Sequence, residues 1–232
     1  MNPIDRVRGR VVGYDEKTGE VIIRAPADFT RLCTREVSEV EITLIDSRPL
    51  SGKQRRSCYA MIREIADWSG DTPEEIKDAL KLDFWCGELL EMADTLFSLK
   101  DAPMSIVAAF QKWLARFIVR NDVPTHVPML QYIDDTSDYV YACLINKKCP
   151  ICCKKADLHH YESIGMGRNR DTIIHEGMEV FPLCREHHME VHSMGRDSFF
   201  DKYHLPHNGI PADKTICKIY NLKSTRSKKK AV

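Results

Sequence analysis

No part of this 232-residue sequence contains the ~18 consecutive apolar residues that a membrane-spanning helix requires. The first residues carry charges at Asp5, Arg6, Arg8 and Arg10 and lack the apolar core of a signal peptide. Internal repeats are missing, and so are low-complexity segments ahead of the C-terminal end. These absences argue against a membrane protein, a secreted protein and a repeat protein. We expect the chain to stay in the cytoplasm.

Excess charge of one sign is also lacking, because 34 Lys and Arg balance 34 Asp and Glu. The two parts of the chain nevertheless differ in charge. From Cys149 onward there are 14 basic and 10 acidic residues, whereas the residues before Cys149 include 20 basic and 24 acidic ones. Residues 214–232 hold seven basic residues and no acidic one. This pattern favours a polyanionic partner for the C-terminal part. A solubilising tail is the alternative for the last segment.

Hydrophobic residues make up 43% of the chain and charged residues 29%, as in ordinary globular proteins. At roughly 150 residues per domain, the length suits one large or two small domains. Residues 7–14 and 21–24 flank a turn that contains Gly19, which predicts a β-hairpin. We expect a short helix at 29–34 and a third strand at 40–44, where apolar residues alternate with polar ones.

From Ser51 onward the spacing of apolar residues becomes that of a helix. One helix face carries the apolar residues Cys58, Met61, Ile62, Ile65 and Ala66. The start of this helix carries Lys53, Arg55 and Arg56. Because cations there oppose the helix dipole, they indicate either a bound anion such as phosphate or a solvated helix face.

Further along the chain, Ser69-Gly70 is expected to end the helix. The next one should begin at Thr72, where Thr-Pro-Glu-Glu forms a capping box with proline at the first helical position. Further helices are predicted at 103–119 and 137–146. The predicted fold class is therefore α+β, with N-terminal strands, a helical segment and a small C-terminal domain.

Nine cysteines, an odd number in a chain expected in the cytoplasm, argue against a disulfide framework. Eight of the nine histidines lie in the same region as the cysteines that follow residue 148. Cys149 and Cys152 form a C-x-x-C pair, and Cys184 and His187 form a C-x-x-H pair at the opening of a predicted helix. Two such pairs supply the four thiolate and imidazole ligands of a structural Zn²⁺. Cys153 is an alternative ligand, and a set of buried free cysteines is the alternative to zinc.

Four other histidines predict a second, open metal site. His159 and His160 end a predicted strand at 156–160, and a second strand is predicted at 179–183. His188 and His192 are i and i+4 on the following helix and therefore share a face. Together with His159 they would give a three-ligand site with open positions, as catalysis requires. His160, on the other side of its strand, is free to act as a general base near pH 7.

The pattern L-H-H followed by L-C-x-x-H-H-x-x-x-H resembles the ββα-metal motif of HNH endonucleases in its zinc-knuckle form, and is especially similar to the colicin DNases. The resemblance covers residues 149–194. It implies that His159, His188 and His192 bind a catalytic divalent ion and that His160 activates water. A three-histidine set accepts Mg²⁺, Mn²⁺, Ni²⁺ or Zn²⁺.

One position departs from the family pattern. Glu179 stands where the family usually has an asparagine, nine residues before the first helical histidine. In the family that asparagine orients the loop between the strands; here Glu179 or Asn169 would have to do so. The loop is glycine-rich and basic, and Arg168 and Arg170 are candidate phosphate contacts. A solvated loop is the alternative.

A second resemblance concerns the region before the cysteines. Residues 48–56, R-P-L-S-G-K-Q-R-R, followed by two helices, are similar to the NinB/Orf family of phage recombination proteins. Such a region joined to an HNH motif resembles HNH nucleases of phages and prophages. This likeness implies binding to single-stranded DNA and cooperation with single-strand-binding protein.

These observations predict a metal-dependent DNA endonuclease of a phage or prophage, acting in the bacterial cytoplasm on duplex, single-stranded or branched DNA. The expected domains are residues 1–145 for DNA handling, 146–212 for the HNH nuclease and 213–232 as a basic tail. Cutting both strands would need a homodimer or a second event. The alternative is a non-catalytic DNA-binding recombination mediator with a structural zinc module, which Glu179 favours. A toxin-like DNase would need a translocation segment, which the sequence lacks.

Overall fold

The computed structural model of this protein describes residues 9–26, 48–89, 96–133, 135–161 and 173–224, together with Thr30, Thr34, Ile42 and Asp46. The chain divides into two compact units, Met1–Leu44 and Ile45–Val232. Helices and strands occur together in it, and the predicted α+β fold class is confirmed. Among the described residues, no helix combines the length and the apolar composition needed to cross a membrane.

In the first unit, β1 (Arg10–Asp15) and β2 (Glu20–Arg24) pair as an antiparallel hairpin. Gly19 ends the turn with a φ of 72°, a conformation that glycine adopts without steric cost. The predicted hairpin is thus confirmed. The helix expected at 29–34 and the strand expected at 40–44 lie outside the described residues, apart from a few isolated positions.

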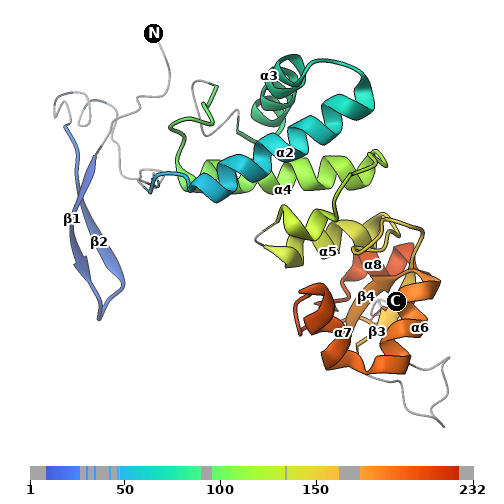
Figure 1. Cartoon of the computed structure of the whole chain (residues 1–232). Coiled ribbons are helices and arrows are strands. Elements are labelled where there is room, and N and C mark those ends of the chain that lie inside the picture. The colour runs from blue at the N-terminus through green and yellow to red at the C-terminus, as the bar shows by residue number, and fades with distance from the viewer. Residues whose placement is uncertain are drawn as a thin grey trace, which may run out of the picture. The chain divides into compact units, whose positions relative to one another are not determined.

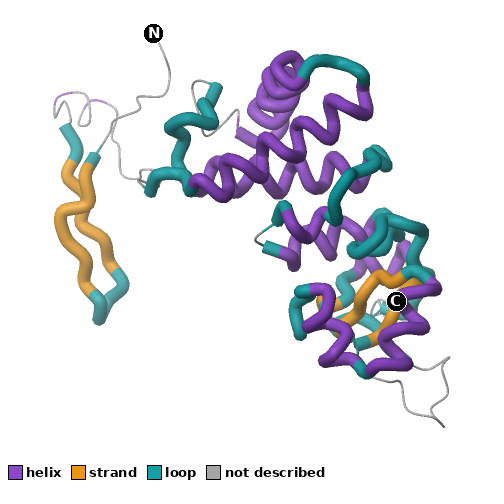
Figure 2. The backbone as a smooth tube through the Cα atoms, in the orientation of Figure 1, coloured by secondary structure: helices purple, strands orange, loops and turns teal. Residues whose placement is uncertain are grey.

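The second unit begins with a helical part. It contains α2 (Gly52–Ser69), α3 (Pro73–Phe84), the π-helical turn η1 (Trp85–Leu89) and α4 (Met104–Arg120). Helices α2 and α4 lie along one another and α3 packs beside them (Figure 1). Figure 2 shows helices and loops through this stretch, with the strands of the unit gathered nearer its C-terminal end.

Local sequence signals set the ends of these helices. Ser51 and Gln54 form a capping box at the start of α2, and Gly70 ends that helix in the left-handed conformation with a φ of 83°. Thr72 and Glu75 form the capping box predicted for α3. Each box satisfies backbone N–H groups that have no partner within the helix.

A first hydrophobic core lies between these helices, and an aromatic group forms its centre: Phe84, Phe97, Phe110 and Trp113, with ring centroids 5.1 to 6.1 Å apart. Phe110 and Trp113, which lie on the helix predicted at 103–119, therefore belong to this core. Apolar burial of this kind contributes roughly 25 cal/mol per Å² and is the main force holding the helices together.

A buried carboxylate sits at the edge of this core. The side chain of Glu64 on α2 is only 6% exposed. It accepts hydrogen bonds from the backbone N–H of His126 at 3.0 Å and from the Tyr132 hydroxyl at 2.8 Å, and lies 2.7 Å from His126 Nδ1. Burial acts to raise the pKa of Glu64, but these hydrogen bonds outweigh it and the pKa is lowered. Glu64 therefore fastens the segment after α4 to α2.

Helix α5 (Thr136–Ile145) belongs to two cores at once. Tyr139 and Cys143 pack in the first core, whereas Val140 and Leu144 pack in the second. This helix is apolar on several sides because it is covered on several sides. It links the helical part to the strands that follow.

The C-terminal part contains a three-stranded antiparallel sheet in the order β3 (Asp157–His160), β4 (Glu179–Leu183) and β5 (Ile210–Pro211). Helix α6 (Arg185–Met194) follows β4 directly, and Cys184 is its N-cap. The two predicted strands and the predicted helix are therefore present.

Three elements of this part have no counterpart among the predictions: β5, α7 (Arg196–Tyr203) and α8 (Lys214–Ile219). Helix α8 occupies the first residues of the segment predicted as a basic tail. Its Ile216 and Cys217 are buried in the second core, although lysines surround them in the sequence. The helix was not predicted because the segment contains few apolar residues among many basic ones.

The Glu64 network leads to a stability prediction. Glu64→Gln puts an amide among groups that donate to a carboxylate, and we expect it to lower the free energy of unfolding by about 1–3 kcal/mol at pH 5.5. Urea unfolding of the zinc-loaded chain measures this loss. Glu88→Gln, at an exposed carboxylate, is the matched control and should change the midpoint little.

The same loss should depend on pH in a defined direction. The hydrogen bond with Glu64 raises the pKa of His126, so its charge adds stability below about pH 6.5 that disappears as pH rises through the raised pKa. The lowered pKa of Glu64 means that its own contribution disappears as pH falls below about 4.5. The loss caused by Glu64→Gln should thus be larger at pH 5.5 than at pH 8.5. An equal loss at both values would contradict the charged pair.

Candidate metal centres

A tight turn carries the first pair of cysteines. Cys149 N donates to Lys154 O and Cys153 N donates to Cys149 O, both at 2.8 Å, and Lys148 pairs with Lys155 as an isolated bridge. This turn aims Cys149 and Cys152 at the N-terminus of α6. There Cys184 is the N-cap residue, and His187 lies within the first turn of the helix.

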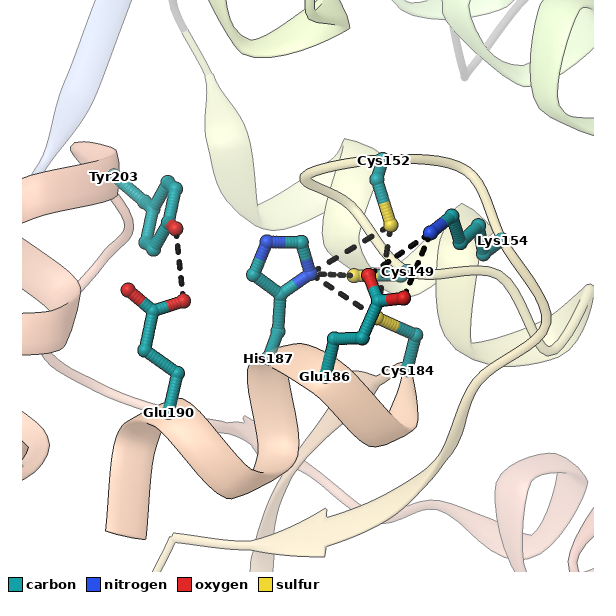
Figure 3. Close-up of polar contacts among 8 residues, drawn as sticks. All are labelled: Cys149, Cys152, Lys154, Cys184, Glu186, His187, Glu190 and Tyr203. Carbon is teal, nitrogen blue, oxygen red and sulfur yellow. Dashed lines mark hydrogen bonds and ion pairs between the residues drawn. The ribbon is translucent and has the colours of Figure 1, made fainter. Parts of the chain in front are cut away.

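Four ligand atoms meet where the turn reaches the helix, as Figure 3 shows. His187 Nδ1 lies 3.4 Å from Cys149 Sγ, 3.6 Å from Cys152 Sγ and 3.1 Å from Cys184 Sγ. The sulfurs of Cys152 and Cys184 are 3.6 Å apart. Tetrahedral zinc bonds of ordinary length would separate two sulfurs by about 3.8 Å and a sulfur and a nitrogen by about 3.5 Å. The group is consistent with a structural zinc.

The charges of this group fit a cation as well. Burial raises the pKa of Cys149, and it raises the pKa of Cys152 to about 12. Burial also lowers the pKa of His187, which keeps its imidazole neutral. Buried thiols of this kind need a cation to become thiolates, and zinc supplies one. Cys153, the alternative ligand, lies outside the group, with its Sγ 3.9 Å from the Tyr139 hydroxyl.

Side chains around His187 hold its ring in place. Tyr203 and Phe199 of α7 pack edge-on against the ring, with centroids 5.3 and 6.3 Å away. On the outer side, Lys154 Nζ lies 2.9 Å from a carboxylate oxygen of Glu186, an ion pair between the turn and α6 (Figure 3). The second core thus reaches this group through α7.

The second group contains His159 from β3 and His188 and His192 from α6, and its ligand atoms all lie within 4.8 Å of one another. The centroid of the His159 ring is 4.7 Å from that of His188 and 5.3 Å from that of His192. His159 is buried, His188 half-buried and His192 exposed, so the group opens to solvent on one side. Three imidazoles with an open side could hold a divalent ion that keeps coordination positions free.

Two imidazoles of this group, those of His159 and His188, have a lowered pKa and are therefore suited to metal binding. Burial, and then the neighbouring His188 and His192, lowers the pKa of His159 to about 4. Burial and His192 also lower the pKa of His188. Metal ions bind the unprotonated ring, so protons compete only weakly at neutral pH.

His160 follows His159 on β3 and pairs with Val180 of β4 in the sheet register, whereas His159 pairs with Phe181. Successive strand residues point to opposite faces, which keeps His160 out of the three-histidine group. Its Nε2 lies 2.9 Å from Nδ1 of His175. Burial, and then His175, lowers the pKa of His160. His175 was not predicted as a site residue, because its contact with His160 joins two positions that are 15 residues apart.

The structure describes some of the predicted DNA-contacting residues and not others. Arg168 and Arg170, like Asn169, lie outside the described residues. Lys53, Arg55 and Arg56 occupy the first turn of α2, where Lys53 and Arg56 are exposed. The Nη2 of Arg55 instead donates to the carbonyl of Lys100 at 2.6 Å, so this guanidinium also ties together two parts of the helical region.

A basic residue close to the histidines was not predicted as a site residue. Arg196, at the start of α7, lies over the ring of Tyr161 with its guanidinium carbon 4.3 Å from the centroid. Tyr161 directly follows His160. Glu179, in the family's asparagine position, begins β4 and accepts a backbone hydrogen bond from Tyr161 N.

Comparison with models of protein families gives a match over most of the chain. Residues 27–223 match the family model described as "Putative HNHc nuclease". Neither the curated proteins nor the solved structures include a match. The matched segment contains all residues of the group of three cysteines and His187, and all residues of the three-histidine group.

The cysteine group leads to a test of its metal. After dialysis, the wild-type chain should retain one tightly bound zinc; Cys152→Ser should lose it and unfold at a lower temperature, because zinc binding is coupled to folding. Lys154→Ala is the matched control, since it removes only the exposed ion pair with Glu186. Elemental analysis and a thermal melt measure both effects. A Cys152→Ser chain that kept as much zinc as wild type would contradict this assignment.

Proposed function

The chain belongs to the HNHc nuclease family, and from this premise we propose that it is a metal-dependent DNA endonuclease that hydrolyses phosphodiester bonds. The family implies a nucleic acid substrate. The observation that carries the proposal is the placement of four histidines: three converge on an open position, and the fourth lies next to one of them on the same strand but outside the group.

In this proposal each histidine has one task. His159, His188 and His192 hold a divalent ion, which when bound stabilises the charge that develops on the phosphate and on the leaving 3′ oxygen. His160 accepts a proton from the attacking water. Its lowered pKa keeps the imidazole unprotonated and thus able to act as a base at neutral pH.

The zinc held by Cys149, Cys152, Cys184 and His187 would have no part in the reaction. A closed four-ligand site leaves no position for substrate. Its contribution is to hold α6 against the preceding turn, so that His188 and His192 face His159. This explains why one short segment carries two groups of ligands.

Binding of DNA would come from basic side chains around these centres. We assign Arg168 and Arg170 to phosphate contacts near the active site, and Lys53, Arg55 and Arg56 to contacts by the helical part. The carbonyl contact of Arg55 leaves Lys53 and Arg56 as the more exposed members of that set. The lysines and the arginine after α8 would add affinity that falls with salt concentration.

The biological setting is proposed from the likeness of residues 48–56 to the NinB/Orf family. The protein would act in the cytoplasm of a bacterial host in the recombination or processing of phage or prophage DNA, together with single-strand-binding protein. Residues 1–145 would handle DNA, residues 146–212 would cut it and residues 213–232 would form a basic end. A homodimer would allow cuts in both strands.

A second candidate function follows from Glu179. If the carboxylate in the asparagine position prevents catalysis, the C-terminal part would be a DNA-binding module stabilised by zinc. Such a module needs only the four ligands of the first group. The three-histidine group and His160 would then serve no purpose, which is why we prefer the nuclease.

A nuclease assay separates the two candidates. Wild type and His160→Ala are incubated with duplex, single-stranded and branched DNA in Mg²⁺ or Mn²⁺, with EDTA as a blank. We expect wild type to cut and His160→Ala to cut about 10²- to 10⁴-fold more slowly, the range for loss of a general base. DNA binding, measured by fluorescence anisotropy, should be unchanged.

His204→Asn is the control for this assay, because His204 is exposed, lies outside both groups and has a positive φ that asparagine tolerates. It should cut like wild type. If wild type binds single-stranded DNA but cuts none of the substrates with either metal, the binding module is correct and the nuclease is not.

A further inference from the structure

His160 and His175 share one hydrogen bond. The Nε2 of His160 lies 2.9 Å from Nδ1 of His175, and the ring centroids are 5.0 Å apart. Two neutral imidazoles can form this bond only if one ring nitrogen donates and the other accepts. The direction of the bond therefore decides which nitrogen of His160 carries the proton.

Backbone hydrogen bonds fix the position of His175 and of the turn that follows it. Its N–H donates to the carbonyl of Lys223 at 2.8 Å, and its carbonyl accepts from Met178 N at 3.0 Å. Gly177, with a φ of 86°, forms that turn and donates to the carbonyl of Ala212 at 2.8 Å. The residues after β5 and after α8 thus fix the place from which His175 reaches His160.

Only one direction of the bond leaves His160 able to act as a base. If Nε2–H of His160 donates to His175, the lone pair on Nδ1 of His160 is free to take a proton from water. If His175 donates, Nδ1 of His160 carries the proton and has no lone pair to offer. In the described part of the chain, no other hydrogen bond reaches the His160 ring.

We propose that His175 is the positioning residue of His160: it accepts a hydrogen bond from Nε2, fixes the ring and leaves Nδ1 as the basic atom. The proposal rests on the proposed function for its catalytic meaning. It also accounts for Glu179, since the contact that orients the base comes from a residue four positions earlier in the chain. His175 acts through His160 and is not assigned a contact with substrate.

The test compares two substitutions of His175 in the full zinc-loaded chain. His175→Leu removes the acceptor and keeps an apolar bulk. His175→Asn is the conservative variant, because its Oδ1 can stand where Nδ1 stood and accept the same bond. We expect His175→Leu to lower kcat by about 10- to 100-fold, the usual effect of losing a residue that orients a functional histidine, with KM little changed. His175→Asn should recover most of kcat.

A double-mutant cycle shows whether His175 acts through His160. His160→Ala combined with His175→Leu should cut no more slowly than His160→Ala alone, because the group being positioned is already gone. A general structural defect would lower the activity of both backgrounds alike. The proposal would be overturned if the double variant cut more slowly than His160→Ala by the same factor that His175→Leu causes alone. It would also be overturned if His175→Leu cut as fast as wild type. Zinc content and melting temperature confirm that the variants fold.

A second readout does not depend on activity. Two-bond ¹⁵N–¹H correlations of the ring nitrogens, in protein labelled on histidine, report the tautomer of each imidazole. His160 should carry its proton on Nε2 in wild type and in His175→Asn, and should lose this preference in His175→Leu. If wild type cuts no DNA but shows this pattern, the nuclease proposal fails and the positioning contact stands. If His160 carries its proton on Nδ1 in wild type, the positioning proposal fails whatever the activity.

Discussion

The convergence of three sulfurs and one imidazole between the Cys149–Cys152 turn and the start of α6 is the constraint on which the rest of the C-terminal part depends. A strand, a tight turn and a helix of ten residues bury too little apolar surface to fix one another. A metal bound at this junction would set both the position and the rotation of α6. Because His188 and His192 lie on the same helix, their placement relative to β3 follows from that junction.

The strand β3 adds the second constraint, which is the alternation of side chains along an extended chain. His159 and His160 are neighbours, yet the pleat of the strand sends them in different directions. A shift of one residue in the pairing with β4 would exchange them, placing His160 among the helical histidines and His159 outside. The pairing of His159 with Phe181, a buried core residue, resists that shift. Packing in the second core therefore decides which histidine belongs to the three-histidine group.

The parts of the molecule that were predictable from sequence depend on contacts between near neighbours. The capping box at Thr72 and the C-x-x-C turn are short patterns with a local physical cause, and the structure contains each of them. Helix α8 and the Glu64 network were not predictable, because they join segments more than sixty residues apart. The same reason hid a second contact of Arg55: besides the DNA contact proposed for it, its guanidinium donates to a carbonyl 45 residues away.

His175 shows how such a distant contact can replace a local one. The sequence pattern leads one to look for the orienting group at position 179, where a glutamate stands. A carboxylate beside the base would raise the pKa of the imidazole and favour its protonated form. Neutral His175 can accept the hydrogen bond without adding a negative charge, and the backbone bonds to Ala212 and Lys223 hold its loop in place. The position of the orienting group in the sequence matters less than its chemistry, provided that another part of the fold holds it there.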